Sequence, residues 1–410
     1  MNIRLASIGL NVMPCFATLA ALAGCGSDVD AKDDGAGGSG GDGGGGDGGD
    51  SQGEGGGGTG GRDDTGGGGM GGGGMGGGGM GGAAVTKPTV VDPSDARLLY
   101  IGRWDRSQPS RPNTDWAGAG VRINMRGTGI RARFGVLSGS PRYQVVVDGI
   151  PKAMLPVPFD DQWTPVVSEL PPGQHVVELF VRTEPILGRH EIESFEITGE
   201  LDAALPAKHR IEYIGDSITC GYGNEAKSVN EQFSADGENN FLAFGSLTAR
   251  ALAADASTIA VSGKRLTGRD GMPDVWEGTL GGARRPAWDF ARWKPEAVVI
   301  NLGTNDWNAP EQERPTTAEF VARYDAFVTR IRQVYGDVFI FCATGPMLTE
   351  PATRAFVDQR LAASDKRVFF VDFGTQQAGD GFGGDYHPSL KTHVKMATTL
   401  TAAIRAQTGW

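Results

Sequence analysis

Cysteine, histidine and positive charge are all scarce in this sequence of 410 residues. The chain has 4 Cys and 5 His, and it carries 38 Lys and Arg against 49 Asp and Glu, which gives a formal net charge of −11. No pair of Cys or His residues has the spacing of a zinc site, so the sequence predicts no metal centre. The negative balance argues against a nucleic-acid partner, because such binding usually requires a basic face.

Long hydrophobic runs are absent after the first 25 residues, so no later segment is predicted to cross a bilayer. Residues 1–25 have a positive start at Arg4, a mostly apolar stretch and then Leu22-Ala23-Gly24-Cys25. This resembles a bacterial lipoprotein signal peptide, which is cleaved before Cys25 and leaves that thiol to be lipidated. The alternatives are an ordinary secretory signal or a membrane helix. We expect an exported protein, attached to the membrane only through Cys25, at the outer membrane or cell surface of a bacterium.

Glycine is concentrated in one segment. It makes up 32 of the 48 residues from Gly35 to Gly82. Such a segment has almost no side chains to bury and cannot offset its chain entropy. We therefore predict a disordered Gly-rich linker over residues 26–90.

Residues 91–205 have the pattern of an all-β domain. Apolar and polar side chains alternate over 121–126 and again over 130–134, and Gly127-Thr128-Gly129 stands between the two runs. Period-2 alternation on both sides of a glycine pair predicts a hairpin. About eight such strands and no helical pattern predict a β-sandwich, most simply a jelly roll.

Residues 206–410 alternate between strand and helix patterns, which predicts an α/β domain. The short apolar runs are 210–214, 257–261, 297–302, 338–343 and 368–373, and helical periodicity separates them. Thr316-Thr317-Ala318-Glu319 is a capping box at the start of one helix. Such alternation predicts a parallel sheet with helices on both faces, with reactive groups at the carboxyl ends of the strands.

Four of these strand ends carry polar residues suited to acyl transfer. A serine hydroxyl becomes a nucleophile when a neighbouring base takes its proton, and a neutral imidazole can do so. An oxyanion also needs N–H donors. Each residue alone has a structural explanation, such as a helix cap or a turn, but their joint order favours catalysis. The four segments are Gly215-Asp216-Ser217, Ser262-Gly263-Lys264, Gly303-Thr304-Asn305-Asp306 and Asp385-Tyr386-His387-Pro388.

These four segments, in this order, resemble the blocks of the SGNH/GDSL hydrolases, and Ile214 to Gly223 resembles the signature of carbohydrate esterase family 2. The resemblance implies that Ser217 is the nucleophile and His387 the general base and acid. It further implies an oxyanion hole made by the Ser217 and Gly263 N–H groups and the Asn305 amide. An N-terminal jelly roll, O-deacetylation of plant-wall polysaccharides such as xylan or glucomannan, and no cofactor are also implied.

One position departs from the superfamily pattern. The usual last block is Asp-x-x-His, but position 384 is Gly, so the available acid is Asp385. On an extended segment, residues i−2 and i point to the same side, so we expect Asp385 to orient His387. One alternative is that Asp385 only solvates the loop. The resemblance to family 2, whose members often have this shorter spacing, implies another: a backbone carbonyl replaces the acid, or the acid is absent.

Four aromatic residues near these blocks are expected to line the cleft, because flat rings stack well on sugar faces. Each could instead belong to the core. They are Tyr222, Trp276, Trp307 and Tyr386.

Two other functions fit the same fold. A lipase or thioesterase would need a long apolar groove, and an inactive carbohydrate-binding surface protein would need only the cleft.

Cys220 and Cys342 could form a disulfide or remain two buried thiols. We expect a monomer.

Overall fold

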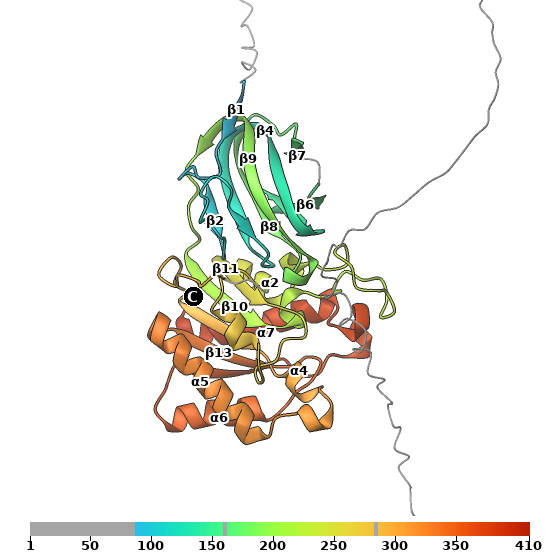
Figure 1. Cartoon of the computed structure of the whole chain (residues 1–410), viewed down its shortest axis with the longest axis vertical. Coiled ribbons are helices and arrows are strands. Elements are labelled where there is room, and N and C mark those ends of the chain that lie inside the picture. The colour runs from blue at the N-terminus through green and yellow to red at the C-terminus, as the bar shows by residue number, and fades with distance from the viewer. Residues whose placement is uncertain (1–86, 159–161, 283–285) are drawn as a thin grey trace, which may run out of the picture. The chain divides into compact units, whose positions relative to one another are not determined.

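The computed structural model describes residues 87–158, 162–282 and 286–410, which all belong to one compact unit (Figure 1). The predicted signal peptide, Cys25 and nearly all of the predicted linker lie outside the described residues. Among the helices that are described, none has the length and hydropathy needed to cross a membrane.

The first domain is the predicted all-β sandwich. Its strands pair antiparallel in the order β1-β9-β4-β8-β5-β6, and β2, β3 and β7 pair with β4 or β9. The alternate side chains of β4, among them Val121, Ile123, Ile130 and Ala132, are buried in one core. The strands are β1 (Pro88–Val91), β2 (Leu99–Ile101), β3 (Asn113–Thr114), β4 (Gly120–Gly139), β5 (Arg142–Val147), β6 (Ile150–Pro156), β7 (Thr164–Val167), β8 (Gly173–Val181) and β9 (Gly188–Asp202).

The structure corrects two expectations in this domain. The hairpin predicted around Gly127 is wrong, because β4 continues through Gly127-Thr128-Gly129 with a bulge where its register with β9 shifts. Glycine is needed there for a different reason: a Cβ on Gly127 would collide with the carbonyl of Thr198 on β9. The predicted linker also runs too far, because residues 88–90 already pair with β9 as part of β1.

The second domain is the predicted parallel sheet, in the order β11-β10-β12-β13-β14. Each strand coincides closely with a predicted apolar run. Parallel strands are buried on both faces, which explains why these runs do not alternate. The strands are β10 (His209–Gly215), β11 (Ala254–Ala260), β12 (Ala297–Asn301), β13 (Phe339–Thr344) and β14 (Val368–Asp372).

Helices cover both faces of this sheet. Val298 and Ile300 of β12 share a core with α5 and α6, whereas Val299 of the same strand shares the other core with α2 and α7. The capping box at Thr316 is confirmed, since both of its reciprocal hydrogen bonds with Glu319 are present. The helices are α1 (Ser217–Cys220), α2 (Phe244–Ala251), α3 (Met272–Trp276), α4 (Thr304–Trp307), α5 (Thr317–Tyr335), α6 (Ala352–Ala362) and α7 (Leu390–Thr408).

The two domains are joined by buried polar contacts. Arg103, which is 1% exposed, donates from the β domain to the Glu212 carboxylate of β10 at 3.1 Å and to the Gly278 carbonyl at 2.8 Å. A buried charge is tolerated only when it is paired and hydrogen-bonded, so these contacts fix one domain on the other.

Candidate active site

Ser217 lies at the first position of α1, directly after β10. The preceding Asp216 is the N-cap of α1, and its Oδ1 accepts a hydrogen bond from the Ile218 N–H at 3.1 Å. Asp216 therefore holds the turn through local backbone. Burial raises the pKa of Asp216 to about 7.

His387 meets Ser217 although 170 residues separate them in sequence. The Nε2 atom of His387 lies 2.9 Å from the Ser217 Oγ atom. His387 follows the 3-10 helix η5 (Gly384–Tyr386), precedes α7 and is 3% exposed. The predicted nucleophile and the predicted base are thus in hydrogen-bonding contact.

The surroundings of His387 favour a neutral imidazole. Burial lowers the pKa of His387 from 6.5 to about 4. Its Nδ1 lies 3.2 Å from the Gly384 carbonyl oxygen, so the proton of the neutral ring belongs on Nδ1. The Nε2 atom is then free to accept the Ser217 proton at neutral pH.

Asp385 does not orient His387 through its carboxylate, so the expectation from the sequence is wrong on this point. Asp385 has φ 49 and ψ 40 and Tyr386 has φ 59, so this segment is left-handed rather than extended. The exposed carboxylate of Asp385 instead accepts a hydrogen bond from the Tyr222 hydroxyl at 2.7 Å. The carbonyl of Gly384 occupies the place expected for the acid.

Tyr222 lies at the site as predicted, but its ring packs on His387 and does not line an open cleft. Its ring stacks on the His387 imidazole, with centroids 4.1 Å apart, and on Phe233, with centroids 3.9 Å apart. The three rings form a stack that covers one face of the imidazole. This cover contributes to the desolvation that keeps His387 neutral.

The predicted oxyanion donors differ in availability. Gly263 lies in the turn after β11 with φ +77, and a Cβ there would meet nothing within 4 Å, so this position borders open space. The side-chain amide of Asn305 donates to Asp216 Oδ2 at 3.1 Å and to the Lys264 carbonyl at 3.0 Å. An oxyanion would therefore have to replace or share one of these two acceptors of Asn305.

Asp306 braces a different loop from its own. Its carboxylate accepts hydrogen bonds from the backbone N–H groups of Leu266 and Thr267, both at 2.8 Å. Those residues follow Gly263 in the loop after β11. Asp306 thereby ties the Asn305 segment to the Gly263 segment, and its burial raises its pKa.

The structure separates the remaining aromatic candidates. Trp276 is wrong as a cleft residue: it is fully buried in the core, and its Nε1 donates to the Glu212 carboxylate at 2.7 Å. Trp307 is half-buried and packs on Phe320, with ring centroids 5.5 Å apart. Tyr386, one residue before His387, is 59% exposed.

Comparison with known proteins supports the same division into two domains. Residues 213–395 match the GDSL-like lipase/acylhydrolase family, and residues 100–206 match the carbohydrate esterase 2 N-terminal family. A solved family two carbohydrate esterase from Clostridium thermocellum, in complex with cellohexaose, is 36% identical with a TM-score of 0.72. The match covers 76% of this chain and 99% of that one. The chain belongs to carbohydrate esterase family 2.

Two curated relatives of this family 2 chain differ in how much of their length it spans. The cellulase/esterase CelE of Acetivibrio thermocellus is 37% identical over 78% of this chain, but the chain spans only 40% of that relative's length. An acetylxylan esterase / glucomannan deacetylase of Cellvibrio japonicus is 25% identical over 77% of this chain and 90% of its own length.

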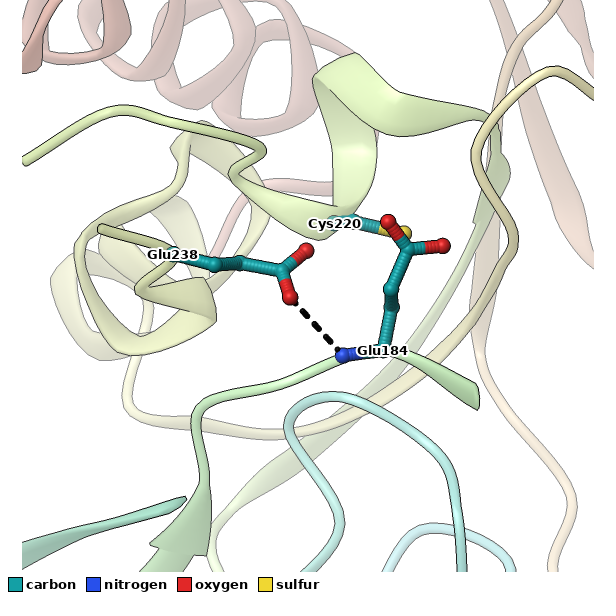
Figure 2. Close-up of side chains that lie close together, drawn as sticks. All are labelled: Glu184, Cys220 and Glu238. Atoms are coloured by element: carbon teal, nitrogen blue, oxygen red, sulfur yellow. Dashed lines mark hydrogen bonds between the residues drawn. The ribbon is translucent and has the colours of Figure 1, made fainter. Parts of the chain in front are cut away.

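Sequence reasoning missed a buried acidic cluster beside the nucleophile helix. Figure 2 shows the side chains of Glu184, Cys220 and Glu238 directed toward one another. One carboxylate or thiol atom of each lies within 4.8 Å of the other two. Residue spacing could not reveal it, because the three residues come from distant segments. The second thiol, Cys342, is also buried, and both cysteines are free rather than disulfide-bonded.

This cluster is better suited to binding protons than to binding a metal ion. Both carboxylate oxygens of Glu184 accept hydrogen bonds from Ser262, and Glu238 Oε2 accepts one from the Glu184 N–H at 3.0 Å. A cation would have to compete with these bonds. Burial raises the pKa of Glu184 to about 7 and that of Glu238 well above its ordinary value, so protons can neutralise the pair. The absence of a metal centre stays a prediction.

Proposed function

We propose that this chain is a serine esterase that removes O-acetyl groups from plant-wall polysaccharides such as acetylated xylan or glucomannan. The observation that carries the proposal is the 2.9 Å contact between Ser217 Oγ and the Nε2 of a buried, neutral His387. Membership of a carbohydrate esterase family supports an ester of a sugar as the substrate. The Cellvibrio japonicus relative, named as an acetylxylan esterase / glucomannan deacetylase, supports acetyl as the group removed.

The proposed reaction passes through an acetyl-enzyme. His387 Nε2 takes the hydroxyl proton as Ser217 Oγ bonds to the acetyl carbonyl carbon. The carbonyl oxygen becomes an oxyanion, stabilised by the N–H groups of Ser217 and Gly263 and by the Asn305 amide. The bond between the acetyl carbon and the sugar oxygen then breaks, and His387 returns the proton to that oxygen. Water attacks the acetyl-serine in the same way, with His387 again as base, and acetate leaves.

Two aromatic side chains are proposed to hold the polysaccharide. Tyr386 presents an exposed ring next to His387, and Trp307 is half-buried on α4 beside Asn305. Rings of this kind stack on the apolar faces of sugars. The solved relative in complex with cellohexaose supports a β-linked sugar chain as the backbone that these rings would contact.

Acetate release from acetylated xylan and glucomannan oligosaccharides tests the proposal. The wild-type chain should release acetate and should prefer short acyl chains on aryl esters, and Ser217→Ala should release none above background. A preference for long acyl chains would instead indicate a lipase or thioesterase. Binding of the oligosaccharide without turnover would indicate a carbohydrate-binding surface protein.

We also propose that the enzyme is a monomer attached to a bacterial membrane through a lipid on Cys25. The support is the Leu22-Ala23-Gly24-Cys25 motif. Cys25→Ser should move the protein from the membrane fraction to the soluble fraction in cells that export it. A variant that stays in the membrane fraction would contradict the lipid anchor.

A further inference from the structure

The segment after β8 leaves the β domain and is bound by the hydrolase domain. The backbone carbonyl of Arg182 accepts a hydrogen bond from the Asn240 N–H at 3.0 Å. The guanidinium of Arg182 donates to the carbonyls of Asp236 and Glu238, both at 3.3 Å. These contacts place the next residues of the β domain, including Glu184, inside the hydrolase domain.

The carboxylate of Glu184 holds the residue that precedes Gly263. Glu184 Oε2 accepts a hydrogen bond from the Ser262 backbone N–H at 2.7 Å, and Oε1 accepts one from the Ser262 hydroxyl. Two bonds to one residue fix both its backbone and its side chain. The Gly263 N–H belongs to the peptide bond that follows Ser262, so holding Ser262 restrains where that N–H lies.

The loop that contains Gly263 is held at several points: the Lys264 N–H donates to the Val261 carbonyl at 3.2 Å, and the Asn305 amide donates to the Lys264 carbonyl at 3.0 Å. Gly263 is exposed, has a left-handed φ and has open space where a Cβ would lie. Two buried carboxylates hold the ends of the 262–267 loop: Glu184 binds Ser262, and Asp306 binds Leu266 and Thr267. One of these two buried carboxylates belongs to the β domain.

Glu184 also lies against the helix that carries the nucleophile. Its carboxyl group approaches the thiol of Cys220, the last residue of α1, and Ser217 is the first residue of that helix (Figure 2). Its side chain is fully buried. Burying a carboxyl group costs free energy unless hydrogen bonds compensate for the lost solvation. The hydrogen-bond partners of Glu184 therefore indicate its role.

We infer that Glu184 is a positioning residue through which the β domain sets the Gly263 N–H of the oxyanion hole against Ser217. The inference rests on the proposed esterase function and adds a catalytic task for the N-terminal domain. Removing one oxyanion donor typically slows acyl transfer by about 10²–10³-fold. Misplacing a donor that is still present should cost less, about 10–10²-fold in kcat.

Steady-state kinetics on a short-chain aryl acetate, expressed per active Ser217, test this role. Active sites are counted by stoichiometric phosphonylation, so that a loss of folded protein does not count as a loss of rate. Glu184→Ala should lower kcat by about 10–10²-fold with KM within about threefold of wild type. Glu184→Gln should retain most of kcat, because its amide can accept from the Ser262 N–H and donate to the Ser262 hydroxyl.

Asp255 supplies the matched control. It is also a buried carboxylate at the domain interface, and it accepts from Arg122 of the β domain at 3.0 Å. It lies near the start of β11, whereas the 262–267 loop follows the end of that strand. Asp255→Ala should reduce thermal stability without lowering kcat per active site.

Ser262→Ala gives a second test that leaves Glu184 in place. It removes one of the two bonds to Glu184 and should lower kcat by about three- to tenfold. If Glu184→Ala does not fold, this variant decides the question. Unchanged kcat in Ser262→Ala and in any folded Glu184→Ala, with an active wild type, would overturn the positioning role alone. A wild type that hydrolyses no ester would overturn the proposed function together with it.

Discussion

The hydroxyl of Tyr222 donates a hydrogen bond to the carboxylate of Asp385 at 2.7 Å, and the ring of Tyr222 stacks on His387. The carboxylate of Asp385 therefore holds the ring that covers the base. The direct partner of His387 Nδ1 is the backbone carbonyl of Gly384 at 3.2 Å. A carbonyl cannot be removed by mutation, so the orientation of His387 depends on the conformation of the 384–386 turn.

Replacing Asp385 should therefore lower kcat only slightly. Asp385→Asn keeps an oxygen that can accept from Tyr222, and kcat should fall less than about tenfold. Ser217→Ala removes the nucleophile and should cost about 10⁴-fold or more. Acetate release by the two variants under the same conditions checks the difference. Equal losses of kcat would show that the carboxylate of Asp385 acts directly on His387.

Removing the ring of Tyr222 should change the titration of His387. Tyr222→Ala exposes one face of the imidazole to water, so the pKa of His387 should rise toward its ordinary value near 6.5. Tyr222→Phe keeps the stack and should retain the wild-type titration. The acid limb of the pH–kcat/KM profile measures the shift. An acid limb that does not move in Tyr222→Ala would mean that the stack does not desolvate the base.

The wild-type enzyme should stay active in mild acid. Burial lowers the pKa of His387 to about 4, so its Nε2 remains unprotonated as the pH falls and is lost as a base only below that value. At pH of about 5 to 6 a solvated histidine would already be largely protonated. The kcat/KM for a neutral aryl acetate should accordingly be nearly flat over this range. A decline centred near pH 6.5 would contradict the buried, neutral base.

Trp276 should contribute to stability and not to substrate binding. Trp276→Phe removes the N–H that binds Glu212 and leaves a small cavity, and it should lower the free energy of unfolding by about 2 kcal/mol. Its KM for acetylated oligosaccharides should match wild type. Tyr386→Ala is the converse control: its free energy of unfolding should be unchanged and its KM should be raised. A raised KM in Trp276→Phe, without one in Tyr386→Ala, would reverse these assignments.

The catalytic pair could be predicted from the sequence because the four segments, taken together and in order, resemble the blocks of a known hydrolase family. Ser217 and His387 each follow an apolar strand, and in a parallel sheet the strand ends converge on one edge. Neither prediction needed the orientation of a side chain. The role of Asp385 did need it, and the left-handed backbone at 385 and 386 was not visible in the sequence.

The errors arose where one local signal has two structural causes. Gly127 and Gly129 suit a turn, but they equally suit a bulge where two strands approach closely, and only the position of Thr198 on β9 decides. A tryptophan such as Trp276 can bind a sugar face or belong to the core. Its burial against Glu212 depends on tertiary structure, which the local sequence does not show. Glu184 comes from the other domain, so no motif near Ser217 could include it.

The acyl-enzyme is the claim on which the rest of the mechanism depends. Rapid acid quench of the wild-type enzyme during turnover of an aryl acetate, followed by peptide mass spectrometry, tests it most directly. We predict one acetyl group on Ser217, absent from Ser217→Ala and strongly reduced in His387→Ala, which lacks the base that activates Ser217. Turnover with no acetyl group on Ser217, or with the label on another residue, would contradict the account.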